Sequence, residues 1–364
     1  MKRHIPVCVL AVLALVLAGQ GLSTATRSDA ATVVKMSAAI DATGKNDVSV
    51  PMAAFFKSVA DGSTVELPAG ARYRMEQTLV LQNRHRLTIE GNGAMFFLVT
   101  PGGLKRSNVI VENSSDIVIR DLVVKGSNPH GGDVAGAYQA AREGQHGISI
   151  LTDTNVWLIN DTITDTYGDF VYIARVTPHD PWTNGVLILG SHFARNGRQA
   201  VTITDARNVV IAANSITDIS RATFDFEPGS PSGGVDNVVI AGNDVGAGGL
   251  LFVAAEAVDP VNHVTIENNR VRGQNLQVWV ANTKPGLRVG WTIVGNTSDS
   301  VSGNPHAALM RMANVNGLQI RDNSQAFSVG RNMVLAEIVA SCGIDVRNNH
   351  IPGSVGPDRV SGHC

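Results

Sequence analysis

The sequence has little cysteine, few aromatic side chains and no excess of basic charge. It holds 3 cysteines in 364 residues, aromatic residues make up 5%, and the formal net charge is −2. So few cysteines exclude a small scaffold held together by disulfides. The lack of a basic excess argues against nucleic acid and against an anionic membrane surface as partners. No apolar run long enough to span a membrane follows the first thirty residues.

The first thirty residues have the three parts of a secretory signal. Lys2 and Arg3 precede an apolar run from Ile5 to Ala18, and small residues follow this run. The run is shorter than a typical membrane span. We therefore expect residues 1–30 to be a signal peptide that is removed, and residues 31–364 to form one secreted, extracellular domain.

Two cysteines remain after the signal peptide is removed, Cys342 and Cys364. Disulfides form and persist in exported proteins. We expect a disulfide between these two residues that fixes the end of the chain. The alternative is two unpaired thiols, because Cys364 is the last residue and chain ends fray.

Short runs of the form Val-x-Ile-x-x-Asn-x-Ile recur along the chain at an almost fixed spacing. From residue 161 onward the steps are 30, 23, 29, 26, 27, 27 and 26 residues. A repeat of about 27 residues with β-branched residues at alternate positions is typical of a solenoid of strands. We therefore predict an all-β fold, a parallel β-helix of about ten coils. The recurring positions are Asp121, Asp161, Ser191, Asn214, Asn243, Asn269, Asn296, Asn323 and Asn349.

The recurring asparagines are expected to be structural rather than catalytic. Residues such as Val209 and Ile211 alternate toward the inside, so that stacked coils bury a continuous core. The asparagine stands where the chain bends between two sheets, and asparagine tolerates the left-handed conformation at low cost. Copies one coil apart, at about 4.8 Å, can also hydrogen-bond each other. We predict a ladder of asparagines whose own backbone is left-handed.

The beginning of the mature chain resembles a known superfamily. It reads Asp41-Ala-Thr-Gly44, then Gly62-Ser-Thr-Val-Glu-Leu-Pro68, then Leu87-Thr-Ile-Glu-Gly91-Asn-Gly93. This series is similar to the N-terminal cap and first coils of the pectin-lyase-like superfamily, which includes polygalacturonases and pectate lyases. The resemblance extends over residues 36–351.

The resemblance implies a right-handed, single-stranded β-helix whose first coil is covered by a helix at about Pro51 to Ala60. Such a cap has a physical reason, because an open coil end exposes the core and unpaired strand edges. The expected organisation is a cap region at 36–75, coils at 76–351 and a C-terminal tail at 352–364.

Three segments are longer than the repeat requires. They lie at residues 125–146, 177–182 and 227–234. Loops that leave one edge of a solenoid commonly form the walls of a binding groove. The alternative is that the coils merely tolerate longer loops there.

The strongest candidate for chemistry is the run Ala222-Thr-Phe-Asp-Phe-Glu-Pro228. Its alternation places Phe224 and Phe226 inward, so Asp225 and Glu227 face outward together, about 7 Å apart along the strand. Two carboxylates on either side of a glycosidic bond can act as acid and base, or as acid and nucleophile. The alternative is that both acids only form ion pairs with neighbouring arginines.

Further residues of the same coils are expected to bind the substrate. Aromatic faces pack against sugar rings, and arginines can bind acidic sugars or lower the pKa of a carboxyl group. The expected substrate-binding residues are Tyr172, Arg175, Gln199, Asp205, Arg221, Phe252 and Trp279.

Motif comparison within the superfamily gives mixed indications. Several members carry a similar Arg-Gln pair followed by an apolar-Asp-apolar-Glu-Pro strand, which matches Arg198-Gln199 and the strand with Asp225. The motif set of polygalacturonases is absent. Gln145-His146-Gly147 matches only the His-Gly part of their Gly-His-Gly motif, which disfavours polygalacturonase activity. Pro178-His179-Asp180 resembles the Asp-Pro-His-Asp motif of mannuronan epimerases, but Thr177 replaces the first aspartate.

We therefore predict a secreted enzyme that cleaves glycosidic bonds in a polysaccharide, with hydrolysis preferred. Asp225 and Glu227 would be the catalytic acids, and Arg198 would position them. One alternative is a uronate lyase or C5-epimerase that uses His146 or His179 as the base. The other is a glycan-binding surface protein without catalytic activity.

No cofactor or metal is expected, and a monomer is the expected state. A lyase would be the exception, because such an enzyme could use Ca²⁺. Asp161, Asp165 and Asp169 are candidate ligands, although their spacing is more typical of turn caps.

Overall fold

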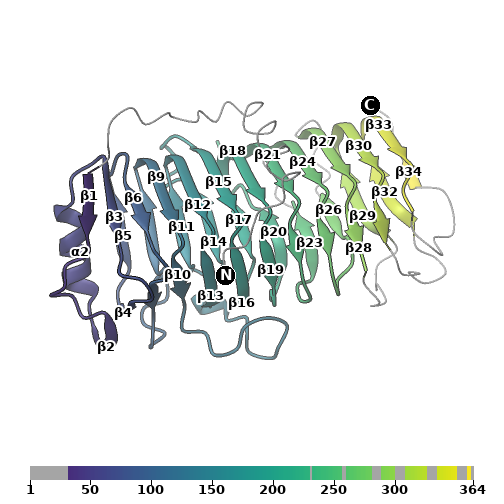
Figure 1. Cartoon of the computed structure of the whole chain (residues 1–364). Coiled ribbons are helices and arrows are strands. Elements are labelled where there is room, and N and C mark those ends of the chain that lie inside the picture. The colour runs from purple at the N-terminus through teal and green to yellow at the C-terminus, as the bar shows by residue number, and fades with distance from the viewer. Residues whose placement is uncertain are drawn as a thin grey trace.

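The computed structural model describes residues 32–229, 232–255, 260–280, 288–299, 308–325, 334–350 and 359–361. Throughout these residues the strands pair in parallel and form three sheets as the chain winds around one axis. About 11 turns, or coils, stack along that axis (Figure 1). The predicted parallel β-helix is confirmed.

From β3 to β32 each coil contributes one strand to each sheet, in the order A, B, C, whereas α2 follows β2 in the first coil and β34 of sheet C follows β33 of sheet A at the end. Sheet A contains β1 (Thr32–Lys35), β3 (Ser63–Glu66), β6 (Thr88–Glu90), β9 (Ser115–Arg120), β12 (Thr154–Ile159), β15 (Thr183–Leu189), β18 (Asp205–Ala212), β21 (Gly234–Ala241), β24 (Val261–Glu267), β27 (Arg288–Val294), β30 (Val315–Arg321) and β33 (Cys342–Arg347). Sheet B contains β2 (Thr43–Asp47), β4 (Arg72–Arg74), β7 (Met95–Phe97), β10 (Val123–Lys125), β13 (Thr162–Thr166), β16 (His192–Asn196), β19 (Ser215–Thr217), β22 (Asp244–Val245), β25 (Arg270–Val271), β28 (Thr297–Ser298) and β31 (Ser324–Gln325). Sheet C contains β5 (Leu79–Gln82), β8 (Val109–Glu112), β11 (Ile148–Leu151), β14 (Val171–Ala174), β17 (Val201–Ile203), β20 (Ala222–Phe226), β23 (Leu251–Ala254), β26 (Val278–Val280), β29 (Ala308–Ala313), β32 (Val334–Val339) and β34 (Arg359–Ser361).

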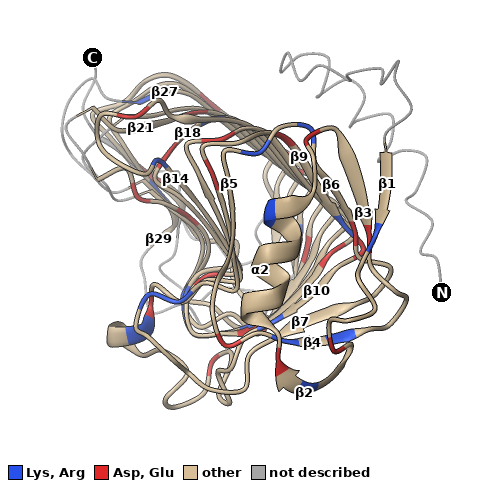
Figure 2. Cartoon of the chain, turned by 90° about the vertical axis from the view of Figure 1, so that its left-hand side faces the viewer, with Lys and Arg blue, Asp and Glu red and all other residues tan. Residues whose placement is uncertain are grey.

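A helix, α2 (Ser49–Ser58), covers the N-terminal end of the stack (Figure 2). Met52 and Phe56 on its inner side are almost fully buried and join the core that runs through the coils. The helix thereby shields apolar side chains that the first coil would otherwise expose. Helix and cap position agree with the sequence prediction, with both ends two residues earlier.

The recurring asparagines form the predicted ladder. Nδ2 and the backbone N–H of Asn243 both donate to Oδ1 of Asn269, at 2.9 Å. Nδ2 of Asn269 in turn donates to the carbonyl of Ile240, also at 2.9 Å. This pattern repeats in each later coil, so the prediction of a structural role is confirmed. The members of this Asn ladder are Asn214, Asn243, Asn269, Asn296, Asn323 and Asn349.

The backbone of the ladder differs from the prediction in one respect. The left-handed residue is the one before each ladder asparagine, as at Ala213 (φ 56°), Asn268 (φ 53°) and Asp322 (φ 57°). The preceding residue makes the bend, which leaves the asparagine side chain directed along the stack. Asp121 was therefore assigned to the wrong position. It is the left-handed residue (φ 55°), and Leu122 occupies the ladder position.

Two predictions at the chain ends lie outside the described residues. The proposed signal peptide, residues 1–30, is one of them, and Cys364 of the expected disulfide is the other. Cys342 begins β33, and its pairing with Cys364 stays a prediction. No helix within the described part is both long and apolar enough to cross a membrane.

Candidate functional site

The middle of sheet C carries a column of outward-facing residues. Asp225 on β20 pairs in register with Thr202 on β17 and with Ala254 on β23. The column continues to Tyr172 on one side and to Trp279 on the other. Neighbouring strands lie about 4.8 Å apart, so Trp279 is roughly 10 Å from Asp225 along the stack. Tyr172 and Trp279 thus share the face of Asp225, as the sequence predicts.

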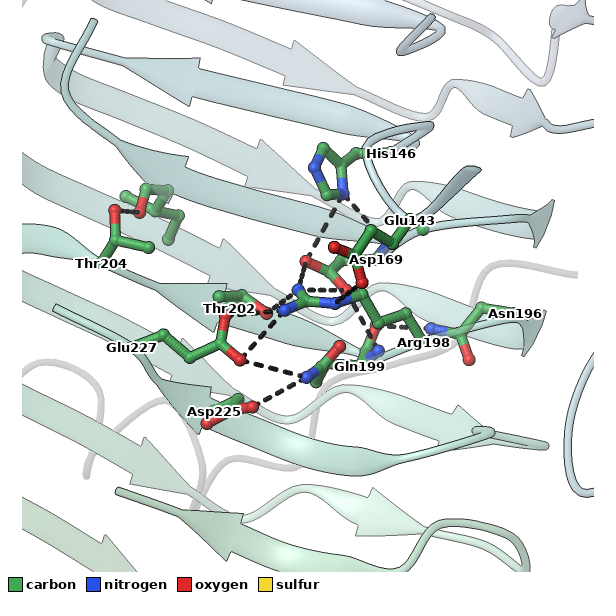
Figure 3. Close-up of polar contacts among 12 residues, drawn as sticks. Glu143, His146, Asp169, Asn196, Arg198, Gln199, Thr202, Thr204, Asp225 and Glu227 are labelled. Atoms are coloured by element: carbon green, nitrogen blue, oxygen red, sulfur yellow. Dashed lines mark hydrogen bonds and ion pairs between the residues drawn. The ribbon is translucent and has the colours of Figure 1, made fainter. Parts of the chain in front are cut away.

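Arg198, in the turn between β16 and β17, joins two carboxylates from different coils. Its Nη2 donates to both oxygens of Glu227, at 2.7 and 2.9 Å. Its Nη1 donates to both oxygens of Asp169, at 2.9 and 3.2 Å. The Arg198 side chain is 13% exposed and that of Asp169 is fully buried, so the arginine is held from its buried side (Figure 3). The two-sided contact fixes the direction of the guanidinium.

Gln199 links the same buried aspartate to the other outward acid. Its backbone N–H donates to Oδ1 of Asp169 at 3.0 Å. Its side-chain Nε2 donates to Oδ2 of Asp225 at 2.7 Å and lies 3.5 Å from Oε1 of Glu227. Asp169 therefore anchors both residues that contact the outward acids (Figure 3).

The two outward acids have different electrostatic surroundings. Burial raises the pKa of Asp225 to about 8, and the charge of Glu227 and a hydrogen bond with it act in the same direction. Gln199 and Arg198 oppose the rise only in part. Asp225 is consequently protonated at neutral pH, whereas Glu227 is half-exposed and ion-paired with Arg198. Environments that differ in this way are typical of an acid and a carboxylate with separate roles.

The buried aspartate below them also has a raised pKa. Burial raises the pKa of Asp169 to about 7, although the charge of Arg198 lowers it. His146 lies beside it, and its Nδ1 accepts the backbone N–H of Asp169 at 3.1 Å. Burial lowers the pKa of His146 to about 3, so the ring is neutral. Its other face stacks on Tyr172, with centroids 4.6 Å apart and the rings nearly parallel.

The long segment before β11 folds over the same residues. Tyr138 donates to Oε2 of Glu143 at 3.0 Å, and Glu143 lies 3.6 Å from Nε of Arg198. The guanidinium of Arg221 lies over the ring of Tyr138, 4.7 Å from its centroid. The segment therefore forms one wall of the site, as expected from its length.

A cavity of about 440 Å³ opens at this place. Asp225 and Glu227 line it together with Gln199 and Arg221 on the polar side. Leu251 and other apolar residues of β20 and β23 also line it. The volume falls in the range of small-molecule sites, and a mixed polar and apolar lining suits a sugar.

Phe252 does not belong to this face, contrary to the prediction. Its side chain is fully buried and packs edge-to-face against Phe224, with centroids 5.7 Å apart. Ala254 takes the outward position beside Asp225. Counting a fixed distance from the Asn ladder leads to Ala254, as observed, and the prediction failed because it shifted this position by two residues to reach Phe252.

Arg175, Asp205 and His179 lie apart from the outward acids. Arg175 and Asp205 are almost buried and pair with each other, Nε to Oδ2, at 3.2 Å. Both were predicted to bind substrate, but their side chains pair with each other and are covered, so they are not presented to the cavity at Asp225. His179 stands exposed in the following loop, and no described contact joins it to Asp225 or Glu227. The loop itself packs on another long segment, since Trp182 donates to the carbonyl of Ser232 at 3.1 Å.

The three aspartates considered as Ca²⁺ ligands are not brought together. Asp161 lies in a ladder position, Asp165 pairs with Arg195, and Asp169 pairs with Arg198. Among the residues that the structure describes, no group of three or more His, Cys, Asp or Glu is placed to hold a metal ion.

Sequence reasoning gave Asp169 no role beside Arg198 and gave none to Glu143 or Tyr138. In the sequence Asp169 looks like an ordinary turn residue that precedes Phe170 and a strand. Only the register between neighbouring coils shows that it contacts Arg198 from the buried side. Glu143 and Tyr138 belong to the long segment, and their contacts depend on its path. The length of that segment was the one available signal.

Comparison with known proteins identifies the fold. A family model described as "Right handed beta helix region" matches residues 85–304, and no curated protein matches the sequence. Among solved structures, a polygalacturonase from Erwinia carotovora ssp. carotovora is similar with a TM-score of 0.64 and 13% identity, over 92% of this chain and 99% of that one. PfbA, a surface adhesin of Streptococcus pneumoniae, is similar with a TM-score of 0.62 and 12% identity, over 91% and 93% of the two chains. An endo-xylogalacturonan hydrolase from Aspergillus tubingensis is similar with a TM-score of 0.54 and 11% identity, over 91% and 100%.

At these identities the structural likeness concerns the fold alone, and the site of this chain has to be judged by its own residues. The family model, in contrast, spans more than half of the sequence. The chain therefore belongs to the right-handed β-helix family.

Proposed function

We propose that this protein is a secreted enzyme that hydrolyses glycosidic bonds in a polysaccharide lying along sheet C. The observation that carries the proposal is the pair Asp225 and Glu227 in one cavity, the first protonated and the second ion-paired. Glycosidases need one carboxylic acid that protonates the leaving oxygen and one carboxylate that acts on the other side of the bond. The names of the polygalacturonase and the xylogalacturonan hydrolase among the similar folds are consistent with this substrate class.

In the proposed reaction Asp225 is the general acid. Its carboxylic proton passes to the glycosidic oxygen as the bond to the anomeric carbon breaks. Gln199 fixes the Asp225 carboxyl group through the 2.7 Å hydrogen bond, which leaves the other oxygen to carry the proton. The raised pKa keeps this proton in place at neutral pH.

Glu227 is the carboxylate that acts on the anomeric carbon. A hydrogen bond with Glu227 contributes to the raised pKa of Asp225, so the two carboxyl groups lie close together. Close carboxyl groups fit the separation of about 5–5.5 Å found in retaining glycosidases better than the roughly 6.5–9.5 Å of inverting ones. We therefore propose Glu227 as nucleophile, with Asp225 returning as base when water releases the sugar.

A lyase or epimerase has less support from the site. His146 is buried and uses Nδ1 to accept the Asp169 N–H, and Arg175 is paired with Asp205. Neither is free to abstract a proton next to a uronate group or to neutralise that group. Glycan binding without catalysis is the remaining alternative, and the adhesin PfbA has a similar fold.

The test is to incubate the mature protein with neutral and acidic polysaccharides and to follow reducing ends and ultraviolet absorbance. We expect new reducing ends without the absorbance of a lyase product, and a product with retained anomeric configuration by NMR.

Glu227→Gln and Asp225→Asn should each lower kcat at least a hundredfold while circular dichroism stays unchanged. Activity of the wild type should fall as pH rises through about 8, because Asp225 loses its proton there. Glycan binding without reducing ends or absorbance would contradict both cleavage reactions and favour a non-catalytic glycan-binding protein. New ultraviolet absorbance would indicate a lyase.

A further inference from the structure

A second cavity lies on the other side of the long segment, away from Asp225 and Glu227. It has a volume of about 450 Å³ and shares no lining residue with the first cavity. Lys125 at the end of β10 and Arg195 on β16 line its floor, and Asp165 on β13 lies between them. Three neighbouring strands of sheet B thus contribute one charged residue each.

The charges of this cavity do not cancel. Asp165 pairs with Arg195, Oδ1 to Nη2, at 2.6 Å, and with Nζ of Lys125 at 3.8 Å. The Asp165 side chain is 8% exposed, whereas those of Lys125 and Arg195 are 46% and 54% exposed. One buried carboxylate therefore orients two accessible cations, and one positive charge remains for a ligand.

The shape of the cavity is fixed by the long segment. A Cβ atom on Gly131 would lie 2.3 Å from Cβ of Arg195, and one on Gly126 would lie 2.2 Å from the carbonyl oxygen of Asp165. Asp165 and Arg195 themselves have left-handed backbones, with φ of 58° and 63°. Non-glycine residues in this conformation, packed against glycines at contact distance, indicate a defined surface and not a loose loop.

Two further features indicate a sugar rather than an inorganic anion. Oγ of Ser127 is buried in the cavity lining and has no hydrogen-bond partner among the described residues. Val99 and Val134 also line the cavity and are 55% and 56% exposed. A hydroxyl-bearing ring has an apolar C–H face for the valines and hydroxyl groups for Ser127.

We propose that this cavity binds an acidic sugar, a ring that carries one carboxylate or sulfate group, through Lys125 and Arg195. This binding does not require the cleavage proposed at Asp225 and Glu227, so either proposal can fail alone. Such a site would hold an acidic part of a glycan on sheet B, apart from the catalytic cavity on sheet C.

The test measures binding by calorimetry to a glucuronic acid trimer, a sulfated glucose trimer and a neutral glucose trimer. The mature Glu227→Gln protein is used throughout, because it should not cleave the probes. Lys125→Gln in this background should weaken the affinity for the acidic trimers about fivefold, the order expected for one half-exposed charge. Lys125→Arg should restore it within twofold, and the neutral trimer should be unaffected. The relative affinity of the two acidic trimers shows which acidic group is preferred.

Two controls make the result decisive. Lys57→Gln removes an exposed lysine from α2, far from the cavity, and should change the affinity less than twofold. Val134→Asp places a negative charge on the exposed rim and should weaken the acidic trimers more than tenfold. The proposal is overturned if Lys125→Gln leaves the affinity unchanged, if Lys57→Gln weakens it equally, or if the neutral trimer loses as much as the acidic ones.

Discussion

The coils from Asn214 onward, here called the regular coils, and the coils before it, the irregular coils, have different side chains at the same corner between two sheets. In the later coils the corner between sheets A and B is a ladder asparagine whose amide satisfies two donors and one carbonyl. In the earlier coils the same positions hold Leu122, Asp161 and Ser191, and only part of the pattern is kept. The earlier coils also carry Asp169 and Arg198, the buried pair beneath the site.

The two groups of coils therefore differ in the kind of buried polar side chain that they contain. The regular coils satisfy the ladder position with neutral amides, which stabilises the stack, although the first of these coils also carries Asp225 and Glu227. The irregular coils bury carboxyl groups with raised pKa values, which costs stability but gives protonation states that neutral amides cannot provide. Three substitutions test this difference.

The largest effect is expected from Asn269→Ala in the regular coils. The change removes the acceptor of the Asn243 backbone N–H, one of the two acceptors of Asn243 Nδ2, and the side-chain donor to the carbonyl of Ile240. A buried group left without a partner costs about 1–3 kcal/mol, so the free energy of unfolding should fall by roughly 3 kcal/mol or more. Denaturant unfolding measures the loss, and activity at a permissive temperature should be unchanged. Asn316→Ala, which truncates an exposed asparagine, is the control and should change stability by less than about 0.5 kcal/mol.

Asp169→Asn in the irregular coils should act mainly on activity. The amide can still accept the N–H of Gln199, but it carries no charge to hold Arg198. We expect kcat to fall about a hundredfold, the order of one lost positioning contact. The alkaline limb of the pH profile should also move below about 8, because the unbalanced charge of Arg198 favours ionised Asp225.

Asp153→Asn is the matched control for this prediction. Asp153 is also buried, and burial raises its pKa to about 7, but it contacts Ser114 and Leu151 and no residue of the site. Equal losses in both variants would mean that Asp169 acts on folding alone.

Asp161→Asn should have the smallest effect, and it should be stabilising. Burial raises the pKa of Asp161 well above its usual range, and its Oδ2 has no partner among the described residues. In the later coils Nδ2 of Asn214 donates to the carbonyl of Ile188, three residues before the preceding corner, and Ile119 is the equivalent residue for Asp161. An asparagine can make this bond at every pH.

The sign of the effect depends on pH. Because the pKa of Asp161 is higher in the folded than in the unfolded chain, its contribution to stability is present below about pH 4 and is lost as pH rises. Asp161→Asn should therefore raise the free energy of unfolding by about 1 kcal/mol at pH 8 and by less at pH 4. A constant difference at both pH values would contradict the buried, protonated state, and exposed Asp133→Asn provides the baseline.

The fold could be predicted from the sequence because it rests on a repeated local pattern. The spacing of the asparagines and the alternation of residues such as Val209 and Ile211 recur from coil to coil. A wrong assignment in one coil is therefore revealed by comparison with the next coil. The acids Asp225 and Glu227 were found for a related reason, since strand alternation alone places both beside inward phenylalanines.

The rest of the site could not be predicted, because it depends on register between coils of unequal length. Asp169 meets Arg198 across 29 residues, and Phe252 is buried while Ala254, two residues later, takes the outward position. Arg175 was expected in the groove, but its pairing with Asp205 depends on how the turns after sheet C close. Such contacts follow from turn geometry, which carries no periodic signal.

The Asn ladder has a consequence for the length of the molecule. Each corner from Asn243 to Asn323 contacts only the coils next to it through the same three hydrogen bonds, so these coils are interchangeable in that respect. Insertion or deletion of one whole coil there would preserve the bonding of its neighbours. The groove on sheet C could in this way grow or shrink by one strand spacing at a time, and its reach along a polymer could change while Asp225 and Glu227 stay in place.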